Sequence, residues 1–132
     1  MRVFLDTNVL VSAVATRGLC ADVLREVLVS HQLVISSPLL NELTNILHSK
    51  FGIPFNVITE FIEMLNQDVI LSEQTESAVI DIQDQDDVII LSTALSGGAE
   101  LFVTGDKEIL ALGKIQHMEI VSPRKFWEIL RA

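Results

Sequence analysis

Short apolar runs alternate with stretches of helical periodicity along this chain, and that alternation constrains the fold more than any other feature. Five runs have the length and composition of buried strands: "RVFL" (2–5), "QLVIS" (32–36), "DVIL" (68–71), "ELFVTGD" (100–106, ending in a turn) and "MEIVS" (118–122). Helical segments between successive strands favour parallel pairing, with helices on both faces of the sheet. We therefore expect one domain over residues 1–132, a three-layer α/β/α sandwich with a central parallel sheet.

The helices are expected where apolar residues recur at intervals of three and four. These segments cover 7–14, 20–30, 37–51, 55–67, 86–98, 107–112 and 122–130. Ser37 and Pro38 predict an N-cap and a first-turn proline, and either Asp6 or Thr7 is expected to cap the first helix. Gly97 closes the fifth segment together with the glycine after it. The polar stretch 72–86 has a weak apolar pattern and predicts a loop or a short helix.

Composition narrows the range of functions. Nine Lys and Arg residues against eighteen Asp and Glu give a net charge of -9, which does not favour nonspecific attraction to nucleic acid phosphates. Phosphate chemistry would have to recruit positive charge locally, and a divalent metal is the obvious source. A single cysteine, Cys20, excludes an internal disulfide and a thiolate-rich zinc cluster. No apolar run approaches the about 18 residues that cross a bilayer, and no secretory signal is evident. We expect a cytoplasmic protein with no membrane association.

Four carboxylates are expected at one edge of the sheet. Asp6 and Asp106 directly follow the first and fourth predicted strands, and open parallel sheets bind ligands beyond the carboxyl ends of their strands. Glu42 lies near the start of the helix after the second strand and borders its apolar stripe. Asp87 begins a later helix. Ile90, Leu91 and Ala94 lie three, four and seven residues after it, so Asp87 is expected on the helix face that packs inward. Its neighbour Asp86 is the alternative at this position.

Four carboxylates without a nearby cation repel one another and raise their pKa values. Mg²⁺ relieves this repulsion, because it prefers oxygen ligands, lowers the pKa of bound water and stabilises charge on a phosphoryl group. Taken singly, each acid has a simpler interpretation: Asp6 as a cap, Asp87 at a helix dipole, Glu42 as a solvated edge residue, Asp106 in a turn. The combination favours a metal-dependent phosphodiesterase.

Three segments resemble the motifs of the PIN domain, a family of mostly metal-dependent ribonucleases. They are "FLDTNVLVSA" (4–13), "SPLLNELTNIL" (37–47) and "DDVIILSTALSGGAELFVTGDKEIL" (86–110), and the likeness continues through "IVSPRKFWEIL" (120–130). The resemblance implies hydrolysis of RNA phosphodiester bonds with Mg²⁺ or Mn²⁺. It assigns the acidic metal-site and catalytic positions to Asp6, Glu42, Asp87 and Asp106, with Asn8 and Thr104 as supporting polar groups.

The same resemblance implies a strand order of 3-2-1-4-5 and frequent homodimers. The subgroup it points to comprises toxins of bacterial and archaeal toxin–antitoxin pairs, so a protein antitoxin is an expected partner beside the RNA substrate. One segment departs from the pattern. Close relatives commonly read Arg-Asp-Pro-Asp-Asp where this chain has "QDQDD" (83–87), so the arginine and the proline are missing.

Two other functions are compatible with parts of this pattern. The first is a PIN-like domain that binds RNA or protein without cleaving anything, its acids serving only structural roles, and measured metal binding would separate this case from the nuclease. A haloacid-dehalogenase-like phosphatase also places an aspartate after its first strand, but it needs a second acid two residues later. That position is Asn8 here, which argues against the phosphatase.

Overall fold

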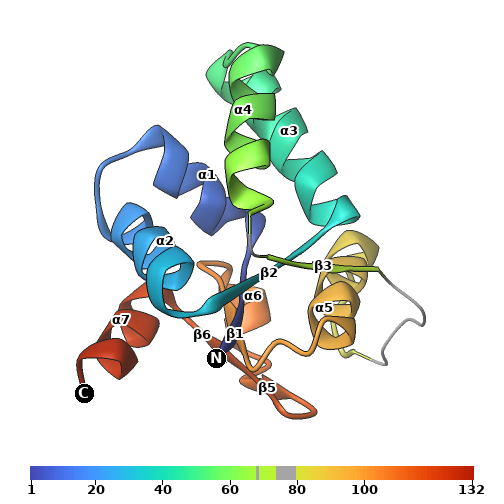
Figure 1. Ribbon diagram of the computed structural model, residues 1–132. Helices are drawn as coiled ribbons and strands as arrows, with labels where there is room; N and C mark the ends of the chain where they lie inside the picture. The colour runs from blue at the N-terminus through green and yellow to red at the C-terminus, as the bar shows by residue number, and fades with distance from the viewer. Residues whose placement is uncertain (68, 74–79) are drawn as a thin grey trace.

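A mixed sheet forms the centre of the computed structural model, which describes residues 1–67, 69–73 and 80–132. Within these residues the sheet has six strands in the order β3-β2-β1-β4-β6-β5 (Figure 1). The strands are β1 (Arg2–Leu5), β2 (Gln32–Ser36), β3 (Ile70–Ser72), β4 (Leu101–Val103), β5 (Lys114–Ile115) and β6 (Met118–Val121). All neighbouring strands pair in parallel except β5 and β6, which are antiparallel.

The expected order 3-2-1-4-5 is confirmed for the five parallel strands, which run β3-β2-β1-β4-β6. Strand β5 was not expected from the sequence. It has two residues and returns to β6 through Gln116, whose φ is 52°, so it is too short to show an alternating pattern. The sheet is therefore mostly parallel, with one antiparallel strand at its edge.

The helices surround the sheet in the expected sandwich. They are α1 (Thr7–Ala15), α2 (Leu19–Ser30), α3 (Ser37–Phe51), α4 (Phe55–Leu65), α5 (Gln85–Ser96), α6 (Lys107–Leu110) and α7 (Pro123–Arg131). Helices α3 and α4 pack against each other and extend away from the sheet (Figure 1). In the described part of the chain no single helix is long and apolar enough to span a bilayer, and only α1 joined to α2, bent by 107° at their junction, passes by length and composition.

Strand β1 lies in the middle of the sheet and forms the centre of the core. Val3, Phe4 and Leu5 are completely buried, because β2 and β4 flank the strand on both edges and helices cover its faces. The ring of Phe4 stacks on that of Phe102 in β4, with 5.2 Å between their centroids. This burial explains why the first strand reads as an unbroken apolar run up to Asp6.

Side-chain caps fix where several helices begin. Asp6 rather than Thr7 is the N-cap of α1. The expected cap of α3 was wrong by one residue: the Ser36 hydroxyl accepts the Leu39 N–H, and Ser37 is already helical. A cap residue keeps extended backbone angles, and the sequence pair Ser36–Ser37 offers two equivalent hydroxyls. In the stretch 72–86, β3 ends at Ser72 and α5 begins at Gln85, while residues 74–79 lie outside the described part.

Helix α5 ends in close contact with the sheet. The Ser72 hydroxyl of β3 donates to the Thr93 carbonyl, and the Thr93 hydroxyl donates to the Ser36 hydroxyl at the end of β2. Gly97 caps the helix at this point, and a Cβ there would lie 2.5 Å from Val34 Cγ1 and 3.0 Å from Ser72 Cβ. Only glycine allows the helix end to pack this closely.

We expect Gly97→Ala to lower the free energy of unfolding by about 1–3 kcal/mol, the usual cost of overpacking a core. The φ of Gly97 is -78°, which alanine adopts without strain, so the loss would report packing alone. Urea titration measures it. Gly105→Ala is the control, because nothing lies within 4 Å of a Cβ there. Equal midpoints for the two variants would contradict the packing argument.

Candidate functional site

Asp6 follows β1 directly and is buried, with 7% of its surface exposed. Both of its carboxylate oxygens accept hydrogen bonds. Oδ1 accepts the Thr7 N–H at 2.8 Å, and Oδ2 accepts the Thr104 hydroxyl at 2.7 Å. The Asp6 N–H donates to the Val103 carbonyl in β4. These bonds satisfy a carboxylate that would otherwise be costly to remove from water, and they hold it at the carboxyl ends of β1 and β4.

Thr104 joins Asp6 to Asp106. The Thr104 side chain is fully buried; its hydroxyl donates to Asp6 and accepts the Asp106 N–H at 3.0 Å. Asp106 is the N-cap of α6, where its Oδ1 accepts the N–H groups of Glu108 and Ile109. Thr104 therefore connects two of the expected site residues.

Glu42 and Asp87 approach the same edge from α3 and α5. Each side chain is half-buried, and each is influenced by the acids that follow the strands. Burial raises the pKa of Glu42, the Thr7 hydroxyl lowers it, and the charge on Asp6 raises it further. Burial likewise raises the pKa of Asp87 to about 6, with additional repulsion from Asp84, Asp106, Asp6 and Glu42 in that order.

The pKa of Asp6 is raised as well, and Asp6 is more deeply buried than Glu42 and Asp87. Burial raises the pKa of Asp6, the bonds from Thr104 and Thr7 oppose that rise, and Asp106 adds to it. The four expected acids thus repel one another across α3, α5 and the ends of two strands. These interactions place the four acids near one edge of the sheet, and their assignment to a metal site stays a prediction.

The cluster is nevertheless not arranged as a closed ligand set. Among the residues with described positions, no group of three His, Cys, Asp or Glu side chains could hold a metal ion. The hydrogen bonds explain this, because Asp6 and Asp106 are oriented toward the backbone groups that they cap. Neighbouring acids therefore raise the pKa values of Asp6, Glu42 and Asp87, but among the described residues the carboxyls do not form a ligand group for a metal ion.

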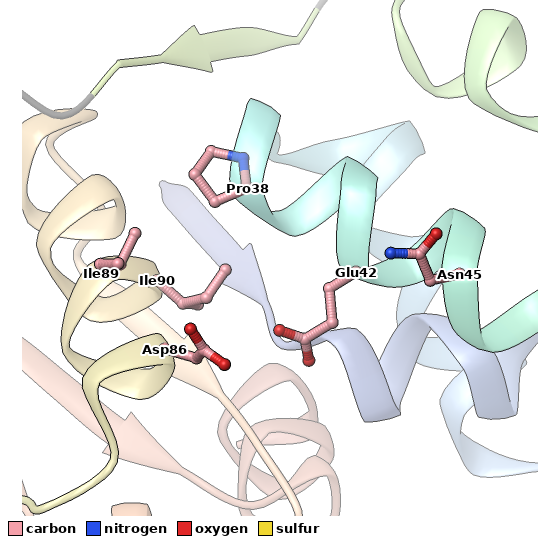
Figure 2. Close-up of a pocket in the computed structure, with 6 residues that line it drawn as sticks. All are labelled: Pro38, Glu42, Asn45, Asp86, Ile89 and Ile90. Carbon is pink, nitrogen blue, oxygen red and sulfur yellow. The ribbon is translucent and has the colours of Figure 1, made fainter.

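A pocket of about 260 Å³ lies between α3 and α5, beside this cluster. Its lining residues are Pro38, Glu42, Asn45, Asp86, Ile89 and Ile90. Figure 2 shows the carboxyls of Glu42 and Asp86 pointing toward each other from the two helices. Asn8, in contrast, is exposed in the first turn of α1, and its side chain makes no hydrogen bond to the residues that the structure describes.

Three residues of this region were not assigned to the site from the sequence. The Thr7 hydroxyl is buried and has no hydrogen-bond partner of acceptable geometry in the described structure, although it faces Glu42 closely enough to lower its pKa. Asp84 caps α5 by accepting the N–H groups of Asp86 and Asp87. The third, Asn45, lines the pocket. Only Asp84 had a recognisable signal, an N-cap residue just before a helix.

Comparison with known proteins identifies the family. The sequence profile of the PIN domain matches residues 2–108, which is most of this chain, so the chain belongs to the PIN domain family. No match is found among curated proteins.

Two solved structures share the fold. One is the crystal structure of VapBC2 from Rickettsia felis bound to a DNA fragment from its promoter. The comparison gives a TM-score of 0.64 at 14% sequence identity and covers 92% of this chain and 98% of that chain. The other is VapBC-1 from nontypeable Haemophilus influenzae, with a TM-score of 0.62 at 20% sequence identity. That comparison covers 94% of this chain and 99% of that chain. At these identities the likeness is one of fold.

The raised pKa of Asp87 predicts a pH-dependent stability. The folded chain binds this proton more tightly than the unfolded chain does, so stability falls as pH rises from about 4 to about 6. In metal-free buffer at pH 7, Asp87→Asn should therefore raise Tm by roughly 3 °C, or about 1 kcal/mol after allowing for solvent screening. Thermal unfolding at pH 4, 5.5 and 7 measures the difference.

Asp22→Asn is the matched control, because Asp22 is also an acid in the first turn of a helix but is paired with Arg25 at 3.2 Å. The Tm of Asp22→Asn at pH 7 should equal that of the parent. If Asp87→Asn were also neutral at pH 7, the carboxyls would not be repelling one another.

Proposed function

We propose that this chain is a metal-dependent ribonuclease built as a single PIN-like domain over 1–132, hydrolysing RNA phosphodiester bonds with Mg²⁺ or Mn²⁺. One observation carries the proposal: Asp6, Glu42, Asp87 and Asp106 lie at one edge of a PIN fold, and burial together with the charges of neighbouring acids raises the pKa values of Asp6, Glu42 and Asp87. Such a cluster costs stability, and a divalent cation offsets that cost.

The donor chemistry suits the metal that the family implies. The four acids supply oxygen ligands only, which hard cations prefer, and the buried Thr7 hydroxyl lies beside Glu42. Mg²⁺ commonly takes one or two carboxylates together with waters and substrate oxygens, so the lack of a three-residue ligand group is compatible with it. We assign ligation to Asp6 and Asp106, with Glu42 and Asp87 completing the site.

When bound, the metal supplies positive charge at the scissile phosphate and lowers the pKa of an attacking water. Side chains of this protein position the ligands and accept the proton. Thr104 and the Thr7 N–H keep the Asp6 carboxylate fixed. Asp87 is half-buried beside these acids and, where it is not itself a ligand, is placed to accept the proton of the attacking water. No side-chain nucleophile is required.

We also propose that the chain acts in the cytoplasm as the toxin of a toxin–antitoxin pair and forms homodimers. The fold shared with two VapBC structures supports this. So does the surface, because four large apolar side chains at the end of α3 and along α4 are exposed: Phe51, Phe55, Val57 and Met64. Exposed apolar side chains that gather on one helical pair suit a protein partner.

The central prediction concerns RNA cleavage. The parent should cut a mixed pool of single-stranded RNAs with Mn²⁺ or Mg²⁺, and EDTA should stop the reaction. Asp6→Asn should cut roughly 100-fold or more slowly, because the amide keeps an acceptor for the Thr7 N–H but loses the charge that binds metal. Initial rates on labelled RNA measure this.

Circular dichroism would show that each variant is folded, and Asp106→Asn provides a second ligand change at a less buried position. Asp22→Asn should retain the parent rate. Cleavage that survives EDTA, or an Asp6→Asn rate equal to that of the parent, would overturn the mechanism.

Metal binding is predicted separately from cleavage. Mn²⁺ should raise the Tm of the parent, by about 2.7 kcal/mol of stability at one hundred times its Kd, and EDTA should reverse the rise. Asp106→Asn should abolish most of it. An unchanged Tm in Mn²⁺ would count against the metal site, whereas a clear rise without RNA cleavage would favour a domain that binds and does not cut.

A further inference from the structure

We propose that the pocket between α3 and α5 receives a guanine base of the RNA substrate, and that Asp86 and Asn45 select that base by its Watson–Crick edge. The inference rests on the proposed ribonuclease function and specifies its substrate. It assigns Asp86 to recognition of the substrate rather than to metal binding.

The walls of the pocket suit a flat, partly apolar group. Pro38, Ile89 and Ile90 provide its apolar surface, and Figure 2 shows them on the two helices with the carboxyls of Glu42 and Asp86 below them. At about 260 Å³ the pocket is smaller than the usual site for a drug-sized ligand. RNA-binding proteins commonly read single-stranded bases that have been turned out of the stack in this way.

The polar lining determines which base fits. No lysine, arginine or histidine lines the pocket, so a phosphate finds no counter-charge there. The carboxylates of Glu42 and Asp86 only accept hydrogen bonds, while the Asn45 amide can donate. Guanine alone among the RNA bases has two adjacent donors, N1–H and N2–H₂, beside an acceptor, O6. A carboxylate pairs with both donors at once, and the Asn45 amide is suited to O6.

The start of α5 separates the roles of its two neighbouring acids. Asp84 accepts the N–H groups of both Asp86 and Asp87 and so fixes the first turn. Successive residues of a helix point about 100° apart, and here Asp87 interacts with Asp106 and Asp6 at the strand ends as well as with Glu42. Asp86 instead faces Glu42 across the pocket (Figure 2). One turn therefore presents one acid to the cluster and one to the pocket.

Glu42 places the pocket relative to the scissile bond. It lines the pocket and also interacts with Asp6 at the strand ends. A base in the pocket would therefore belong to a nucleotide next to the phosphate that is cut. The chain would then show a guanine preference at one position flanking the cleavage site.

The test is to cleave a randomised single-stranded RNA pool with Mn²⁺ and to sequence the new ends. We expect guanine to be enriched about tenfold at one position beside the cut, the discrimination that one bidentate pair provides. Asp86→Asn should remove the enrichment while the pool is still cut, and Asn45→Ala should reduce it. Asp22→Asn should leave both rate and preference unchanged.

Replacing that guanine with inosine, which lacks the N2 amino group, should slow cleavage several-fold in the parent but not in Asp86→Asn. A merely structural role for Asp86 would not produce this dependence on one substrate atom. The proposal is overturned if the parent shows no guanine preference, if Asp86→Asn keeps it, or if Asp86→Asn cuts every RNA as poorly as Asp87→Asn.

Absence of any cleavage by the parent would overturn the proposed function instead, and the pocket is then tested by binding. In an NMR titration with Mg²⁺ present, guanosine 5′-monophosphate should shift the Asp86 and Asn45 amide signals, and uridine 5′-monophosphate should not. Equal responses to both nucleotides, or none, would overturn the guanine site by itself.

Discussion

The structure depends on keeping one carboxylate, Asp6, out of water at the end of its central strand. A buried carboxylate is tolerated only when hydrogen bonds replace its hydration, and here they come from the first turn of α1 and from Thr104, 98 residues away in sequence. The same bonds bring the ends of β1 and β4 together. The group around which a metal site can form is thus also the group that joins the two halves of the sheet.

Sequence reasoning predicted the fold well because each layer leaves a local pattern. Strand β2 coincides with the expected run 32–36, and α3 spans the expected 37–51. The errors occurred where the pattern is too short or is shared by two neighbours. Strand β5 has two residues, and Ser36 caps α3 next to an equivalent serine. Neither the existence of β5 nor the choice between the two serines can be read from periodicity, because both are decided by tertiary contacts.

The site was predictable to the level of which acids gather, and no further. Position after a strand was enough to place Asp6 and Asp106, and helix phase placed Glu42 and Asp87 nearby. The sequence could not show that Asp84 adds its charge to the cluster, that the buried Thr7 hydroxyl lies beside Glu42, or that α3 and α5 leave a pocket between them. These facts depend on distances between elements, which spacing along one element does not contain.

The crowding of carboxyls has an evolutionary consequence. One base change converts an aspartate codon into an asparagine codon, and at this edge of the sheet such a change removes negative charge where the fold already carries too much. Most substitutions destabilise a fold, whereas this one reduces the repulsion among its carboxyls. A chain that carries such a substitution should therefore persist as a well-folded PIN domain.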